Sequence, residues 1–294
     1  MKILGLGRIK KTTSRFLGQF NKIKFENHIQ CPDFEKELQL ILNNKIQINL
    51  ELVTFTNSKN FLDFLLSILS FVSSNGLPVK WTIYADDEFT LFQKKLLSQF
   101  SFLVFKNWFD NVSIDNKLLF GSSWQYRKYL SFSTHSFSST TIFLDSDVLF
   151  YNHFKKYIEI IKEGNWYLPD PAEAFSVDEE IFEESNYKRN MYVINSGFIV
   201  LNHMPAWNLG LDYLKKTSKK GILTHFTEQS AINIVYTNDP NAKILEPRRF
   251  HISLVDNFRI RVLKTDHLAI RHYVGPIRHK MWQASWKKFI KILY

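Results

Sequence analysis

The chain is short of cysteine, of long apolar runs and of glycine-rich loops, and each shortage excludes a class of protein. It holds one cysteine, Cys31, in 294 residues, which excludes an intramolecular disulfide framework and fits a reducing compartment. No run of about 18 or more apolar residues occurs, so we expect no transmembrane helix. The basic stretch from Lys2 to Lys11 has no long apolar segment behind it, so we expect no signal peptide. These observations predict a cytoplasmic protein, with membrane contact only at its surface.

Glycine is scarce where a dinucleotide-binding loop would need it. Gly5 and Gly7 stand two apart, as in the dinucleotide fingerprint, but the third glycine is missing and no strand and helix surround the pair. We therefore predict no dinucleotide site.

The composition is that of a globular protein with anionic partners. Hydrophobic residues make up 45% and charged residues 22% of the chain, and the net charge is +10. Such a charge favours nucleic acid, a nucleotide substrate or an acidic membrane surface. We find neither zinc-finger spacing nor the aromatic and basic signature of a single-strand binder, so we expect no nucleic acid partner.

Strands and helices alternate along most of the chain, which predicts an α/β fold with a mostly parallel sheet and helices on both faces. We expect three parts: a basic, then helical lead-in (1–47), a main domain (48–280) and a basic, aromatic C-terminal helix (281–294). The predicted strands are 50–55, 79–85, 102–105, 141–144, 191–201, 243–245, 250–254 and 268–272. The predicted helices are 61–72, 88–99, 122–132, 152–162, 207–216 and 227–235. The acidic stretch 170–184 is interpreted as a solvated loop or short helix.

Two aspartates follow the most apolar predicted strand, 141–144. In an open α/β sheet, ligands bind just beyond the carboxyl ends of the strands. Asp145 and Asp147, spaced i, i+2 at such an end, could share one hard divalent cation through their oxygens, and that cation could hold a diphosphate. The alternative is a strand-end turn, where Asp and Ser are common without any ligand.

The Asp-x-Asp motif is one of several polar motifs in a fixed order. Tyr126-Arg127 precedes it, and Asn195-Ser196-Gly197, Glu228-Gln229 and His272-Tyr-Val-Gly275-Pro-Ile-Arg278 follow. From about Leu50 to Trp282 this order resembles the retaining glycosyltransferases of family 8, the group of glycogenin and of bacterial lipopolysaccharide galactosyl- and glucosyltransferases. The resemblance implies a Rossmann-like GT-A fold and transfer of a hexose from a nucleotide sugar such as a UDP-sugar. It also implies a glycan or lipid-linked acceptor.

The resemblance assigns a role to each motif. It implies that Asp145, Asp147 and His272 bind Mn²⁺ or Mg²⁺, and a mixed oxygen and imidazole shell suits Mn²⁺ better. The remaining roles are as follows: Gly275 and Arg278 at the diphosphate, Arg127 at the donor sugar, Asn195, Ser196 and Gly197 beside that sugar, Glu228 and Gln229 at the reacting centre, and Phe55, Thr56 and Asn57 at the base.

The sequence departs from the family pattern at several of these positions. Arg278 replaces the usual lysine, Ser196 replaces threonine, and Glu228 replaces aspartate. The aspartate that usually reads the base has no clear counterpart near Phe55, which leaves the base of the donor open.

Two other classes remain as alternatives. A nucleotidyltransferase of sugar phosphates would need a glycine-rich phosphate loop after the first strand, and residues 55–60 contain no glycine. A non-catalytic binding protein of the same fold would show eroded metal ligands, whereas all three are present.

The C-terminal segment 281–294 allows two interpretations. On a helix, Trp282, Trp286, Phe289 and Leu293 share one face, and most of the lysines lie off that face. Such a helix could lie on an anionic membrane, or its aromatic face could pack against the sheet.

Overall fold

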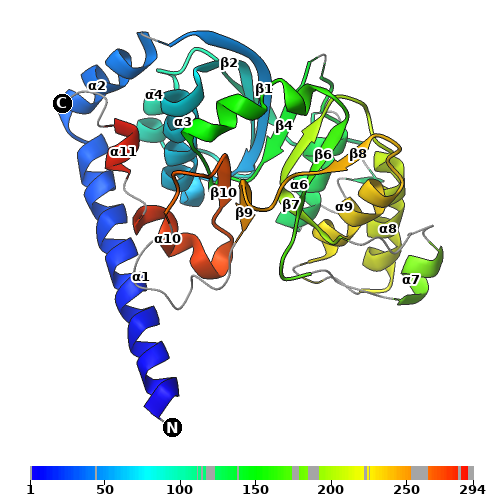
Figure 1. The fold of residues 1–294 in the computed structure, drawn as a ribbon. Helices are drawn as coiled ribbons and strands as arrows, with labels where there is room; N and C mark the ends of the chain where they lie inside the picture. The colour runs from blue at the N-terminus through cyan, green and yellow to red at the C-terminus, as the bar shows by residue number, and fades with distance from the viewer. Residues whose placement is uncertain are drawn as a thin grey trace.

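The computed structural model describes most of the chain in a single α/β arrangement (Figure 1). The described residues are 2–43, 45–110, 112–113, 115–116, 123–137, 139–173, 179–184, 192–221, 224, 226–252, 264–283 and 286–290. Side chains are described for these residues except 2–10, 179, 182–183 and 276.

The elements of the first half are α1 (Lys2–Ile29), α2 (Pro32–Asn43), β1 (Gln47–Thr56), α3 (Phe61–Asn75), β2 (Leu77–Ala85), α4 (Leu91–Leu97), β3 (Leu103–Asn107), α6 (Trp124–Ser133), β4 (Thr141–Leu144) and β5 (Val148–Phe150). Those of the second half are β6 (Asn165–Pro169), α7 (Glu179–Glu184), β7 (Ile194–Leu201), α8 (Trp207–Lys219), α9 (Thr227–Thr237), β8 (Ala242–Ile244), β9 (Phe250–Ile252), β10 (Ile270–His272), α10 (Arg278–Gln283) and α11 (Lys287–Ile290).

A seven-stranded sheet in the order β3-β2-β1-β4-β7-β6-β8 forms the centre of the molecule. All neighbouring strands pair in parallel except around β7, which is antiparallel to both β4 and β6. The strands β1, β4 and β7 are apolar because both faces of the sheet are covered, and every residue of β4 and β7 is buried. The mostly parallel α/β sheet predicted from the alternation is thus confirmed.

A second, three-stranded sheet in the order β5-β10-β9 lies beside the first (Figure 1). Chain order places β2 and β3 on one side of β1 and β4 on the other, so the sheet has its topological switch between β1 and β4. Ligands of doubly wound sheets bind at this switch, beyond the carboxyl ends of the strands. The turn after β4 leaves the first sheet there and continues directly into β5 of the second.

Some local elements were missed or predicted wrongly. The basic start of the lead-in, for which no element was predicted, forms the 28-residue helix α1. The predicted helix 152–162 is instead two 3₁₀ turns, Asn152–Tyr157 and Ile160–Lys162. Strand β6 was missed, because its five residues include a polar first residue and a proline.

The C-terminal segment does not form one amphipathic helix, and its aromatic face points inward. Trp282 and Trp286 are 2% and 8% exposed, and their rings lie 5.3 Å and 5.5 Å from that of Phe25 on α1. Phe289 is also buried, against Tyr151. The packing interpretation is therefore right and the membrane interpretation wrong for these side chains, while Leu293 lies outside the described residues. Among the described helices, none is both long enough and apolar enough to cross a bilayer.

Candidate functional site

The turn between the two sheets holds the polar cluster that the sequence predicted. Asp145 follows β4, and its backbone N–H donates to the carbonyl of Gly197 on β7 (3.0 Å). Three residues later β5 begins, and β10 pairs antiparallel with it so that His272 lies opposite Val148. The N–H of Tyr273 donates to the carbonyl of Asp147 (2.9 Å), which fixes this register. Residues 125 positions apart are thereby brought into contact.

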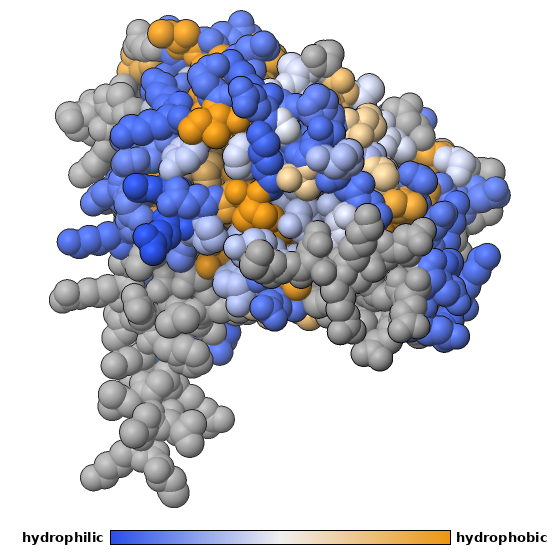
Figure 2. Space-filling model, turned by 45° about the vertical axis from the view of Figure 1, so that its right-hand side comes forward, coloured by the Kyte–Doolittle hydropathy of each residue, from blue (hydrophilic) through white to orange (hydrophobic). Residues whose placement is uncertain are grey.

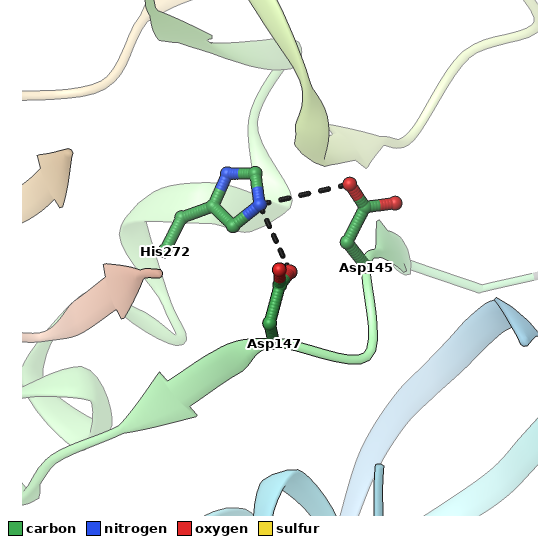
Figure 3. A group of neighbouring side chains, drawn as sticks. All are labelled: Asp145, Asp147 and His272. Atoms are coloured by element: carbon green, nitrogen blue, oxygen red, sulfur yellow. Dashed lines mark hydrogen bonds and ion pairs between the residues drawn. The ribbon is translucent and has the colours of Figure 1, made fainter. Parts of the chain in front are cut away.

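Asp145, Asp147 and His272 point toward one another (Figure 3). One ligand atom from each of them lies within 4.8 Å of the others. His272 Nε2 is 3.1 Å from Asp147 Oδ1 and 3.6 Å from Asp145 Oδ2. Asp147 and His272 are buried, whereas the side chain of Asp145 is 29% exposed and opens the cluster to solvent.

The cluster fits a divalent cation. Two carboxylates and an imidazole form the mixed oxygen and nitrogen donor set that suits Mn²⁺. Ligands at right angles around an ion with bonds of about 2.1 Å lie about 3 Å apart. The two nitrogen–oxygen separations, 3.1 Å and 3.6 Å, are close to that value.

Asn195 sets the orientation of His272. The side-chain oxygen of Asn195 accepts the backbone N–H of Gly197 at 2.9 Å, which identifies it as the oxygen. The same oxygen lies 2.9 Å from His272 Nδ1, so Nδ1 must donate and carry a proton. In the neutral ring, Nε2 then has a free lone pair facing the two aspartates, as a metal ligand requires.

Gly197 leaves the space that the His272 ring occupies. A β-carbon at Gly197 would lie 2.0 Å from His272 Cε1 and 2.5 Å from Nδ1. A side chain at this position would therefore displace the imidazole. The predicted Asn-Ser-Gly segment thus supports the histidine, in addition to any contact with a sugar.

Each aspartate is also held by a cation at its other oxygen. Lys128 Nζ is 2.7 Å from Asp145 Oδ1, and Arg278 Nη2 is 2.7 Å from Asp147 Oδ2. Burial alone would raise the pKa of Asp147, but His272 and Arg278 outweigh it and hold this pKa well below its ordinary value. The Asp147 carboxylate therefore remains ionised, and both aspartates turn their second oxygen toward His272.

Lys128 connects the aspartates to α9. It is fully buried, and its Nζ also lies 3.5 Å from Glu228 Oε1 and 3.3 Å from Ser196 Oγ. Burial alone would lower the pKa of Lys128, but Asp145 and Glu228 raise it above the ordinary value. Lys128 is thus a permanent positive charge between two carboxylates.

Glu228 and Gln229 lie at the start of α9 and face the same space. Burial raises the pKa of the Glu228 carboxyl despite the nearby Lys128, and Ser196 Oγ donates to Glu228 Oε2 at 2.8 Å. Gln229 Nε2 donates to Asp170 Oδ2 at 2.9 Å. Asn233 of α9 accepts the backbone N–H of Ile194 on β7 and donates to the carbonyl of the same residue, and these two hydrogen bonds fix the helix relative to the sheet.

These side chains line one cavity of about 600 Å³. The face in Figure 2 is mostly hydrophilic with small separate apolar patches. Trp124 at the start of α6 and Phe226 before α9 are 44% and 41% exposed. The cavity is lined by Trp124, Lys128, Asp145, Asp147, Asp170, Ala172, Asn195, Ser196, Phe226, Glu228, Gln229, Ile252, His272, Val274, Gly275 and Arg278.

Other predicted residues lie outside this cavity lining. Arg127 forms a two-pronged ion pair with Asp86 after β2, with Nε–Oδ1 at 2.5 Å and Nη2–Oδ2 at 3.0 Å. Phe55 and Thr56 are buried at the end of β1. Asn57 accepts the N–H of Asn60, whose side chain in turn lies 3.4 Å from Arg278 Nη1.

Lys128 and Asp170 were missed in the sequence. Lys128 is next to the predicted Arg127, and a lysine in a helix is usually solvated, so nothing in the sequence around it indicated that its side chain is buried. Asp170 was placed in the acidic loop, yet it is 8% exposed and directly follows β6. Recognising β6 as a strand would have placed Asp170 beyond a strand end, beside the other carboxylates.

The sequence matches no protein-family model and no curated protein sequence. The fold, however, is similar to solved glycosyltransferase structures. The galactosyltransferase LgtC, crystallised with donor and acceptor sugar analogues, superposes with a TM-score of 0.51 at 11% identity, over 82% of this chain and 95% of that one. GlyE, a glycosyltransferase of Streptococcus pneumoniae TIGR4, gives a TM-score of 0.53 at 12% identity, over 82% of this chain and 63% of that one.

Similarity at such low identity concerns the fold, and the activity has to be argued from the site. The seven-stranded, mostly parallel sheet and these superpositions support the same conclusion about the fold. The chain has the GT-A type of glycosyltransferase fold, an α/β fold with a mostly parallel central sheet flanked by helices.

Proposed function

We propose that this protein is a metal-dependent glycosyltransferase that moves a hexose from a UDP-sugar to a glycan or lipid-linked glycan acceptor with retention of configuration. The observation that carries the proposal is the cluster of Asp145, Asp147 and His272 at the switch point of the sheet. A cation held by these three residues would neutralise charge that develops on the departing nucleoside diphosphate.

Arg278 supports a diphosphate site next to the cluster. Its side chain is 41% exposed and borders the cavity, while its guanidinium forms an ion pair with Asp147. A guanidinium can bind two phosphate oxygens at once, where lysine acts as a point charge. Gly275 supports the same role, because a β-carbon there would meet nothing within 4 Å and the backbone is open to a ligand.

The donor sugar would lie between Lys128 and α9. We assign to Lys128 the sugar contact that the resemblance suggested for Arg127, because Lys128 lines the cavity and Arg127 is bound to Asp86. Glu228 is the carboxylate nearest to this space on the α9 side. Its partners, Ser196 and Lys128, would orient it toward the reacting carbon.

Retention is consistent with either of two courses. A double displacement needs a carboxylate nucleophile, which Glu228 could provide and the amide of Gln229 could not. In a front-face displacement, the leaving phosphate oxygen takes the acceptor proton and Glu228 stabilises the positive charge that develops on the sugar. An NMR spectrum of the product that shows an inverted linkage would contradict both.

The experiment is donor hydrolysis and transfer by the whole chain on a panel of nucleotide sugars, with Mn²⁺, with Mg²⁺ and with excess chelator. We expect cleavage of a UDP-hexose that requires the metal and that disappears in Asp145→Asn. Cleavage that persists in chelator would remove the metal from the mechanism. Release of pyrophosphate from a nucleoside triphosphate and a sugar phosphate would instead indicate a nucleotidyltransferase, and metal binding without any turnover a binding protein.

A further inference from the structure

Helix α1 is attached to the molecule by one face. Ser14 and Phe25 are fully buried against α10 and the C-terminal segment. Gly18 lies between them, so close to α10 that a β-carbon there would be 2.4 Å from the carbonyl oxygen of His279. Figure 1 shows α1 along the outer edge of the molecule, with its N-terminal turns extending beyond the rest of the chain.

The opposite face of α1 carries large apolar side chains in solvent. Phe16, Phe20 and Ile23, at i, i+4 and i+7, are 68%, 47% and 45% exposed. Their helical positions lie about 140° to 180° from Phe25, at 100° per residue. The rings of Phe16 and Phe20 stack with centroids 6.5 Å apart. We call Phe16, Phe20 and Ile23 the α1 stripe.

The α1 stripe stands in a strongly basic helix. The sequence of α1 contains seven Lys or Arg residues and one acidic residue, Glu26, which gives six of the ten net positive charges of the chain. Lys24 Nζ lies 4.3 Å from the centre of the Phe20 ring. On the attached face, burial together with Lys280, Arg15 and Lys11 lowers the pKa of His279 to about 4, as expected in a positive field.

We propose that the α1 stripe docks on an anionic phospholipid surface, with α1 lying in the plane of the membrane interface. A helix with aromatic side chains on one face and many Lys and Arg side chains inserts its aromatic side chains among the lipid tails and places its positive charges at acidic headgroups. A second copy of the chain is a poorer occupant, because two such helices would bring about six positive charges each into contact. The buried tryptophans of the C-terminal segment hold α1 in place.

The docked helix would lie next to the candidate site. α10 begins with Arg278, which binds Asp147, and the next residue, His279, packs on Gly18 of α1. One short helix, α10, therefore separates α1 from the cavity. If the proposed function holds, this arrangement suits an acceptor that is itself anchored in the membrane.

The test is flotation of the whole chain with vesicles of phosphatidylcholine alone or mixed with phosphatidylglycerol. We expect binding to the anionic vesicles that weakens as salt is added, and no binding to the neutral ones. Phe16→Ser with Phe20→Ser should lower the bound fraction by about tenfold or more. Leu91→Ser with Phe92→Ser removes a pair that is 87% and 42% exposed on α4, and should leave binding unchanged.

Three results would overturn the proposal. They are equal recovery with neutral and anionic vesicles, full binding by the Phe16→Ser/Phe20→Ser variant, and a dimer in sedimentation that this variant abolishes without any vesicle binding. The last would identify a second copy as the partner. Flotation does not depend on turnover, so vesicle binding without glycosyl transfer would contradict the proposed function and leave the docking surface standing. Circular dichroism of both double variants checks that they are folded.

Discussion

Replacing Gly197 by alanine is expected to destroy the metal cluster without touching a ligand. The new β-carbon would stand 2.0 Å from His272 Cε1, and ordinary contacts begin at 3.4 Å, so the imidazole has to move by about 3.4 − 2.0 = 1.4 Å. Metal–ligand distances tolerate deviations of about 0.2 Å. His272 would also be pushed off the Asn195 oxygen that fixes its tautomer.

The loss can be given an approximate size. Substitutions of residues that only hydrogen-bond to a metal ligand and orient it reduce metal affinity by about 10–100-fold. Displacement of the ligand itself should therefore weaken Mn²⁺ binding by about 100-fold or more, which is about 2.7 kcal/mol. The overpacked β7 should in addition lower the free energy of unfolding by about 1–3 kcal/mol.

Mn²⁺ titration followed by electron paramagnetic resonance measures the affinity, and urea unfolding measures the stability. Gly275→Ala is the matched control, since its β-carbon would meet nothing within 4 Å. It should keep full stability and Mn²⁺ affinity while weakening binding of the nucleotide sugar. Wild-type Mn²⁺ affinity in Gly197→Ala would refute this account of how His272 is held.

Three further substitutions test neighbouring contacts. Asn195→Leu should weaken Mn²⁺ binding by about 10–100-fold, whereas Asn195→Asp, which can accept the same two hydrogen bonds, should not; equal losses would contradict the proposed role in setting the His272 tautomer. Lys128→Met should lower the free energy of unfolding by about 3 kcal/mol. It should also enlarge the rise in Tm on adding Mn²⁺, because the metal ion then replaces the lost positive charge, whereas Arg127→Met should leave that Mn²⁺ effect unchanged. Asp147→Asn should cost about 1–3 kcal/mol at neutral pH. Because the folded pKa of Asp147 lies below its ordinary 3.8, that stabilisation is present above this pH and lost as the pH falls, so the wild type and Asp147→Asn should converge in acid unfolding curves; a constant gap would be the contrary result.

The cluster of Asp145, Asp147 and His272 was predictable because its main signals are local. Thr141 to Leu144 form a fully apolar strand, and the two aspartates directly behind it could lie only at a strand end. Parallel strands bring their carboxyl ends to one edge of the sheet, so the position of Asp145 followed from the predicted fold. That His272 joins the same edge came from the resemblance, since no local pattern pairs β10 with β5.

The supporting cations could not be assigned from sequence. Lys128 and Arg127 are adjacent on α6, and which of them turns inward depends on the angle at which the helix crosses the sheet. The partners that stabilise a buried Lys128, Asp145 and Glu228, lie 17 and 100 positions further along the chain. Hydrophobic periodicity carries no information about such pairing.

In the C-terminal segment, the sequence likewise could not show what the apolar side chains pack against. Trp282, Trp286 and Phe289 have the spacing of an amphipathic helix, and that spacing is equally suited to lipid or to protein. Phe25 of α1 decides the outcome, because it packs against both tryptophans. A stripe of exposed apolar residues that includes two aromatic rings lies instead on α1, where the basic sequence alone gave no reason to expect a helix with two apolar faces.

The junction between the two sheets also has a consequence for the order of folding. The contact between Asp147 and His272 closes a loop of 125 residues, and closing such a loop is slow because many conformations must be lost first. β1 and α3, by contrast, follow one another directly in the chain. Metal uptake during refolding should therefore lag behind the recovery of far-ultraviolet circular dichroism. A bound ion would then mark those molecules in which the distant segments have already met.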